Sequence, residues 1–175
     1  MRRRCKLDWR SLRRTPYKTN LNMRARRFVS KWMPVIAWVF LMFVGSTDVL
    51  SAEHTSRFLV PFLLWLDPHI SAATIVSIHF ALRKIGHLTE YAILAALLWR
   101  GLRGTFNTAS KMVLALSTFL AAAAFAASDE YHQSFVPSRT ASAHDVMIDC
   151  VGAFVTVLLC WMFARRNPAY QASIK

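Results

Sequence analysis

Two short polar runs in an otherwise apolar chain carry the side chains best suited to acid–base or anion-binding chemistry. The longer run, residues 128–152, holds five Asp, Glu and Arg side chains: Asp129, Glu130, Arg139, Asp145 and Asp149. The shorter run, residues 83–91, reads RKIGHLTEY and mixes basic and acidic groups. Charged groups in or beside a lipid-facing segment are costly, so they are usually paired or functional. We therefore expect the two runs to meet in one polar site.

The shorter run places its chemistry on one helical strip, because residues three or four apart share a face of a helix. Lys84, His87 and Tyr91 have this spacing, and Glu90 lies within reach of His87. Imidazole changes its charge near neutral pH, which suits it to proton transfer. We predict that His87 and one of the carboxylates, with Glu90 among the candidates, act as general acid and base and that Lys84 and Tyr91 bind substrate.

The longer run contributes further carboxylates on two helices. The spacing relates Asp129 to Gln133 on one helix and aligns Asp145, Asp149 and Gly152 on the next. Gly152 has no side chain, so it allows a neighbouring backbone to approach closely. Asp149 is the deepest carboxylate and must be hydrogen-bonded, paired with a cation or protonated.

These positions complete the expected site. The candidate catalytic groups are His87, Glu90, Asp129, Glu130, Asp145 and Asp149. The candidate substrate-binding groups are Lys84, Tyr91, Gln133 and Arg139. An arginine such as Arg139 can hold a phosphate or carboxylate through two parallel hydrogen bonds. None of the serine and threonine residues nearby stands out as a nucleophile.

Two other interpretations of the same residues remain open. In the first, the polar side chains only tie helices together, with His87 and Arg139 satisfying the carboxylates and no substrate involved. In the second, His132, Glu130 and Asp145 form a metal site. We expect no metal and no other cofactor, because no group of Cys and His residues has the spacing of a known zinc site.

Composition indicates a small membrane protein. The chain has 175 residues, of which 55% are hydrophobic, and its net charge is +13. Twelve of its 22 Lys and Arg residues lie at or before Lys31, so the basicity belongs to a tail. A basic tail before an apolar span fixes membrane orientation and attracts anionic lipids. No nucleic-acid recognition motif accompanies this charge, so we expect membrane lipids, not nucleic acid, as partners.

The chain divides into three parts. We expect residues 1–31 to form a disordered basic arm, residues 32–166 a membrane domain, and residues 167–175 a short tail. The first span covers residues 32–50. Its basic start and the following Ser51-Ala52 also match a signal peptide with its cleavage site. We expect a retained helix because further spans follow it, and either Met1 or Met23 could be the start of the protein.

Three further crossings follow the first, giving an all-α bundle of four transmembrane helices. The apolar patch at residues 58–66 predicts a short interfacial helix between the first and second crossings. The remaining crossings cover residues 85–99, 112–127 and 142–164. With four crossings, all the basic segments share one side, which the positive-inside rule assigns to the cytoplasm. Both termini are then cytoplasmic, and both polar runs emerge on the opposite face.

The two polar blocks resemble the VanZ-like family of small bacterial integral membrane proteins. The resemblance rests on RKIGHLTEYAILAALLWR and DEYHQSFVPSRTASAHDVMIDCVGA and extends over about residues 34–164. Ser138 departs from the glycine that many relatives carry before the arginine. The resemblance implies a protein of the bacterial cytoplasmic membrane, linked to low-level resistance to the glycopeptide teicoplanin.

Three functions compete on this basis. The leading hypothesis is a site that binds, and can modify, an anionic component of the cell envelope or a lipid. The second is a non-enzymatic scaffold or modulator of envelope enzymes, in which the polar residues are inter-helix ties. The third, an ion-coupled carrier built on Asp149, is weaker because the chain has no internal repeat. The sequence leaves the oligomeric state open.

Overall fold

The chain folds into α-helices, and its computed structural model describes residues 16–45, 52–106, 110–135 and 142–166. Within these ranges there are five helices: α1 (Pro16–Gly45), α2 (Ala52–Leu66), α3 (Ala72–Thr105), α4 (Lys111–Gln133) and α5 (Ala143–Arg166). The all-α class is therefore confirmed, as is a short apolar helix, α2, between the first two long ones.

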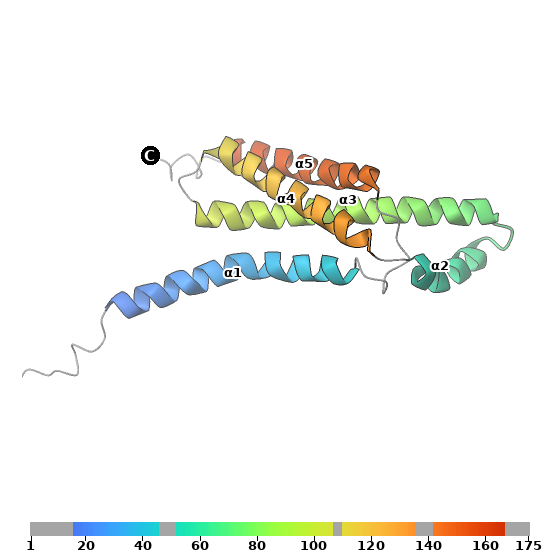
Figure 1. The fold of residues 1–175 in the computed structure, drawn as a ribbon, viewed down its shortest axis with the longest axis horizontal. Helices are drawn as coiled ribbons and strands as arrows, with labels where there is room; N and C mark the ends of the chain where they lie inside the picture. Colours follow the sequence, from blue (N-terminus) through green and yellow to red (C-terminus); the bar gives the residue numbers. More distant parts are fainter. Residues whose placement is uncertain (1–15, 46–51, 107–109, 136–141, 167–175) are drawn as a thin grey trace, which may run out of the picture.

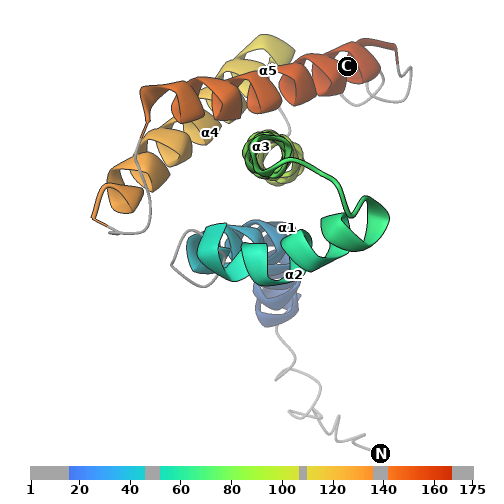
Figure 2. The same cartoon turned by 90° about the vertical axis from the view of Figure 1, so that its right-hand side faces the viewer.

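α3 is the central helix. It contacts α5, α4, α1 and α2, and α4 and α5 also contact each other. Figure 2 looks along α3 and shows α4 and α5 on one side of it and α1 and α2 on the other. Side chains on α3 can therefore meet groups from both α4 and α5.

The packed face of α4 follows a four-residue period. Its buried positions include Leu114, Thr118, Ala122, Ala126 and Glu130. Small residues in the middle of a membrane helix let neighbouring helices approach closely. The middle of the packed face of α4 therefore consists of small residues, and the same face becomes polar toward the C-terminal end of the helix.

α3 and α5 come into close contact at Gly152. A Cβ atom added to Gly152 would overlap the carbonyl oxygen of Leu88 on α3. The prediction that Gly152 admits a neighbouring backbone is therefore confirmed. Because His87 precedes Leu88 and Asp149 lies about one turn before Gly152, this contact also brings the polar faces of the two helices together.

Among the described residues, three helices are long and apolar enough to cross a membrane: α1 over Phe28–Gly45, α4 and α5. α3 is not among them, because its polar residues interrupt the apolar sequence. Exposed apolar side chains cover much of α1, α4 and α5. Such a surface suits contact with lipid, since apolar patches of this extent are unusual on soluble monomers.

The first helix begins earlier than expected. α1 starts at Pro16, so the predicted disorder of the basic arm is wrong for residues 16–31. Proline is favoured in the first turn of a helix, where its missing N–H has no intrahelical partner to lose. Residues 1–15, the segment 46–51 with the suggested cleavage site, and the tail 167–175 lie outside the described residues.

The basic segments gather at one end of the bundle, as the sequence predicts. Figure 1 shows the C-terminal ends of α3 and α5 and the start of α4 at the same end. There the Lys31 ammonium donates to the carbonyl oxygen of Gly104. Nε1 of Trp32 donates to Oγ1 of Thr105 over 3.0 Å. These contacts fix the basic half of α1 against the end of α3.

Candidate functional site

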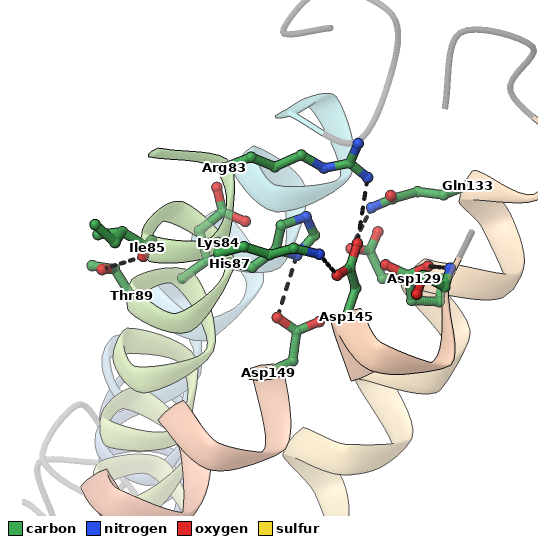
Figure 3. A network of polar contacts seen from close by, with 12 residues as sticks. Arg83, Lys84, Ile85, His87, Thr89, Asp129, Gln133, Asp145 and Asp149 are labelled. Atoms are coloured by element: carbon green, nitrogen blue, oxygen red, sulfur yellow. Dashed lines mark hydrogen bonds and ion pairs between the residues drawn. The ribbon is translucent and has the colours of Figure 1, made fainter. Parts of the chain in front are cut away.

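The two polar runs meet where α3, α4 and α5 converge. Figure 3 shows His87 of α3 directed toward Asp149 of α5, and Lys84 directed toward Asp145. Nδ1 of His87 lies 3.3 Å from Oδ1 of Asp149. The expectation that the two runs form one polar site is therefore confirmed in its geometry.

His87, Glu130 and Asp149 form what we call the buried cluster. Their exposed fractions are 6%, 5% and 0%. One nitrogen or oxygen atom from each lies within 4.8 Å of the corresponding atoms of the other two. Nδ1 of His87, Oε1 of Glu130 and both Asp149 oxygens have no hydrogen-bond partner within the described part of the chain. The His87–Asp149 pair is thus close, but it is not oriented as a hydrogen bond.

Each member of the buried cluster occupies the inward face of its helix. His87 lies on the buried strip of α3 that continues through Tyr91 and Leu94. Glu130 ends the small-residue face of α4, and Asp149 is about one turn before Gly152 on α5. The local helical periods therefore direct all three side chains inward, and the Gly152 contact brings α3 and α5 close enough for them to meet.

Neighbouring groups orient the carboxylates of α4. Oε2 of Glu130 accepts a hydrogen bond of 2.8 Å from the backbone N–H of Ser142, just before α5. Asp129 accepts a bond of 3.0 Å from Nε2 of Gln133, which confirms their predicted relation on one helix face. The Ser142 hydroxyl in turn accepts from the backbone N–H of His144. The end of α4 is thereby tied to the start of α5.

Asp145 binds two cations. The Lys84 ammonium forms an ion pair with Oδ1 of Asp145, and Nη2 of Arg83 lies 3.5 Å from its Oδ2. α5 starts next to Ser142, close to the expected start of the last crossing at residue 142. The Asp145 side chain, however, pairs with α3 instead of reaching back to cap its own helix.

Arg83 is the site residue that sequence reasoning missed. It is spaced four residues before His87, so helical periodicity alone could have placed it on the same face. Its Nε and Nη2 atoms are buried and have no hydrogen-bond partner within the described ranges. Nη2 is already in the ion pair with Asp145, so Nε is the buried donor without a partner among the described residues.

The remaining predicted residues lie around the buried cluster or outside the described chain. Tyr91 is buried in the apolar core. Glu90 is half-buried, and its backbone carbonyl accepts a bond of 3.1 Å from Nε1 of Trp38. Gln133 is fully buried beside Asp129. Arg139 falls within residues 136–141, outside the described residues, so its anion-binding role stays a prediction.

The alternative metal set considered from the sequence is not brought together in the described structure. The ring of His132 packs on Phe43 of α1, with centroids 4.7 Å apart. Asp145 is paired with Lys84. The donor atoms that do converge belong to the buried cluster, which shares only Glu130 with that set.

Comparisons with known proteins bear on the chain as a whole. A family model described as VanZ/LLP1 matches residues 31–164. No curated protein and no solved structure matches the chain. The matched range contains α2, α3 and α4, most of α5 and the apolar part of α1 from residue 31 on, and it includes every member of the buried cluster.

Proposed function

Because the chain belongs to the VanZ/LLP1 family, we propose that it is a VanZ-like integral protein of a bacterial cytoplasmic membrane. Its polar site binds and modifies an anionic component of the cell envelope or a lipid. By the family resemblance, this activity is linked to resistance to the glycopeptide teicoplanin. The observation that carries the proposal is the convergence of the buried cluster with the Arg83 and Lys84 cations at one place in the bundle.

In this proposal α3 also crosses the membrane, which brings the number of crossings to four. The site faces the outside of the cell. Basic segments are retained on the cytoplasmic side of membranes. The C-terminal ends of α3 and α5 lie at the end of the bundle away from the start of α5 (Figure 1), and their last turns contain Arg103 and Arg166. Lys31 contacts Gly104 near the end of α3. That end would therefore be cytoplasmic, together with both termini.

The two cations would receive the anionic group. The side chains of Arg83 and Lys84 are 32% and 20% exposed, whereas that of Asp145 is 3% exposed. An incoming anion therefore meets the cations before it meets the carboxylate. The Arg83 guanidinium can hold a phosphate or carboxylate in two parallel hydrogen bonds, and an incoming anion would compete with Asp145 for it.

His87 would then transfer protons. A histidine 3.3 Å from a buried carboxylate can accept a proton from an attacking water or hydroxyl, and the carboxylate stabilises the resulting imidazolium. In the proposal, Asp149 is the carboxylate that stabilises the His87 imidazolium. Exclusion of bulk water from the buried cluster strengthens such electrostatic interactions.

The competing function is a scaffold whose polar residues only hold helices together. The ion pair between Lys84 and Asp145 favours it, because that pair joins α3 directly to α5. A membrane scaffold needs no substrate, and its polar residues would contribute to stability alone.

Teicoplanin susceptibility separates these functions. A susceptible Gram-positive host would express the wild-type chain or the His87→Gln, Asp149→Asn or Arg139→Ala variant, with protein abundance measured in the same cells. His144→Gln, which changes an exposed histidine near the start of α5, is the matched control. The proposal expects the three site variants to lose protection at normal abundance while the control keeps it. If protection survives in all three, the proposal is wrong, and if it falls only in proportion to abundance, the scaffold is favoured.

A double apolar replacement gives a second discrimination. Replacing a buried polar pair by apolar residues of similar volume is often neutral or stabilising. For a functional site, the His87→Leu/Asp149→Leu variant should be at least as stable as wild type yet give no protection. A marked loss of its thermal stability in detergent would instead identify the pair as an inter-helix tie.

A further inference from the structure

We propose that the buried cluster of His87, Glu130 and Asp149 binds a divalent transition-metal ion, with Zn²⁺ as its representative. The inference deepens the proposed function and rests on it in assigning the ion to the same site. With the ion bound, His87 and Asp149 would serve as its ligands in place of the proton-transfer pair. Metal binding itself needs no substrate, so the two can fail separately.

Charge balance is the first argument. Glu130 and Asp149 are buried carboxylates that make no ion pair with a Lys or Arg of the described residues. The nearby cations, Arg83 and Lys84, both pair with Asp145 instead. Burying an uncompensated charge costs several kcal/mol. A divalent cation among the three side chains would neutralise both carboxylates.

The separations between donor atoms are the second argument. Bonds from zinc to nitrogen or oxygen are about 2.0–2.2 Å, which places neighbouring ligands of a tetrahedral site about 3.4 Å apart. Nδ1 of His87 and Oδ1 of Asp149 are already 3.3 Å apart. All three donor atoms lie within 4.8 Å of one another, which is at most about 1.4 Å more than the ligand spacing of a tetrahedral site. Small changes in side-chain torsion angles would close that difference.

The unsatisfied atoms are the third argument. Buried polar atoms in native proteins are nearly always bonded, so orphaned ones require an explanation. Here they are the very atoms that would coordinate an ion, including Oε1 of Glu130 and both oxygens of Asp149. The other oxygen of Glu130 is held by the N–H of Ser142 at 2.8 Å. Such outer hydrogen bonds orient the carboxylate ligands of metal sites.

The donor set identifies the class of ion. Mg²⁺ and Ca²⁺ prefer oxygen ligands alone, whereas imidazole with carboxylates suits zinc and related transition metals. Three protein ligands are also the number found in catalytic zinc sites, which leave one position open. An oxygen of an anionic substrate, held by Arg83 and Lys84, could occupy that position.

Direct binding measurements on the full chain in detergent test the inference. The chain would be stripped with EDTA, loaded with Zn²⁺ and dialysed, and its metal content measured by mass spectrometry. We expect about one tightly held ion per chain in wild type and in the exposed control His144→Gln. His87→Gln, Glu130→Gln and Asp149→Asn should bind roughly tenfold more weakly or worse. The visible spectrum of bound Co²⁺ should indicate nitrogen and oxygen ligands without thiolate.

Several outcomes would overturn the inference. Wild type could retain no Zn²⁺ or Mn²⁺ and show no thermal shift on their addition. Binding could also be equal in the cluster variants and the control, or the Co²⁺ spectrum could show a thiolate ligand. The wild-type content and spectrum decide even if a variant fails to fold. If wild type binds no metal while the site variants still lose teicoplanin protection, metal binding is refuted and the proposed function stands. If wild type binds the metal while the site variants keep their protection, the proposed function alone is refuted.

Discussion

Replacing Gly152 by alanine tests the close contact of α3 with α5 on which the site depends. The new Cβ would overlap the carbonyl oxygen of Leu88 and lie 3.1 Å from its carbonyl carbon and 3.3 Å from its Cα. These are backbone atoms of a helix, so they cannot rotate away as the end of a side chain can. The two helices must move apart, and the distance between His87 and Asp149 must increase with them.

The magnitude follows from two opposing terms. Alanine in place of glycine within a helix gains about 1 kcal/mol of helix propensity. Overpacking a close interface costs about 1–3 kcal/mol, and backbone overlap places Gly152→Ala at the upper end. The net loss in the free energy of unfolding is therefore about 2 kcal/mol.

Gly86→Ala is the matched control, because a Cβ at Gly86 would meet no atom within 4 Å. This variant keeps only the propensity gain, so the two variants should differ by about 3 kcal/mol. The assay is reversible unfolding of the purified chain in mixed micelles, followed by circular dichroism as the SDS fraction rises. Gly152→Ala should also lose Zn²⁺ binding, and Gly86→Ala should retain it. Equal stability of the two variants would refute the close packing of α3 on α5.

Three further predictions concern the bundle and its orientation. Asp145→Asn leaves the Lys84 ammonium without its carboxylate and should lower the free energy of unfolding by about 1–3 kcal/mol in the same assay. This loss is smaller than that for a fully buried ion pair, because Lys84 is partly exposed. Adding Lys84→Met should restore most of that loss, and failure to do so would contradict the pairing. Trp38→Phe removes the hydrogen bond to the Glu90 carbonyl and should cost about 1 kcal/mol while leaving metal content unchanged. On a cysteine-free background, a cysteine at Ser134 should be labelled from outside intact cells and one at Thr105 should be protected; the opposite pattern would reverse the proposed topology.

Helical periodicity predicted most of what surrounds the site. Lys84 and His87 are three residues apart on the polar strip, and both contact carboxylates of α5. Gly152 was identified as a point of close approach because glycine beside a buried carboxylate leaves room for a backbone. Such features depend on the order of residues within one helix, which the sequence contains directly.

Contacts between helices were harder to predict, because they depend on rotation and axial shift as well as on spacing. Asp145 could have capped its own helix or met any nearby cation, and only the packing of α3 shows that it pairs with Lys84 and Arg83. Glu130 likewise joins His87 and Asp149, not His132. The early start of α1 was missed for another reason: basic residues without apolar periodicity were interpreted as disorder, although nothing between Pro16 and Pro34 interrupts a helix.

α3 combines two requirements that conflict in a membrane. It holds the polar groups of the site, and these interrupt the apolar sequence that a lone crossing helix needs. It also occupies the centre of the bundle, where α4 and α5 shield one side of it and α1 shields another (Figure 2). Its charges are compensated from outside the helix, since Asp145 of α5 binds both Arg83 and Lys84. In the proposed four-crossing topology, the site and the stable insertion of α3 therefore require the same contact with α5, and a change that separates these helices should impair both.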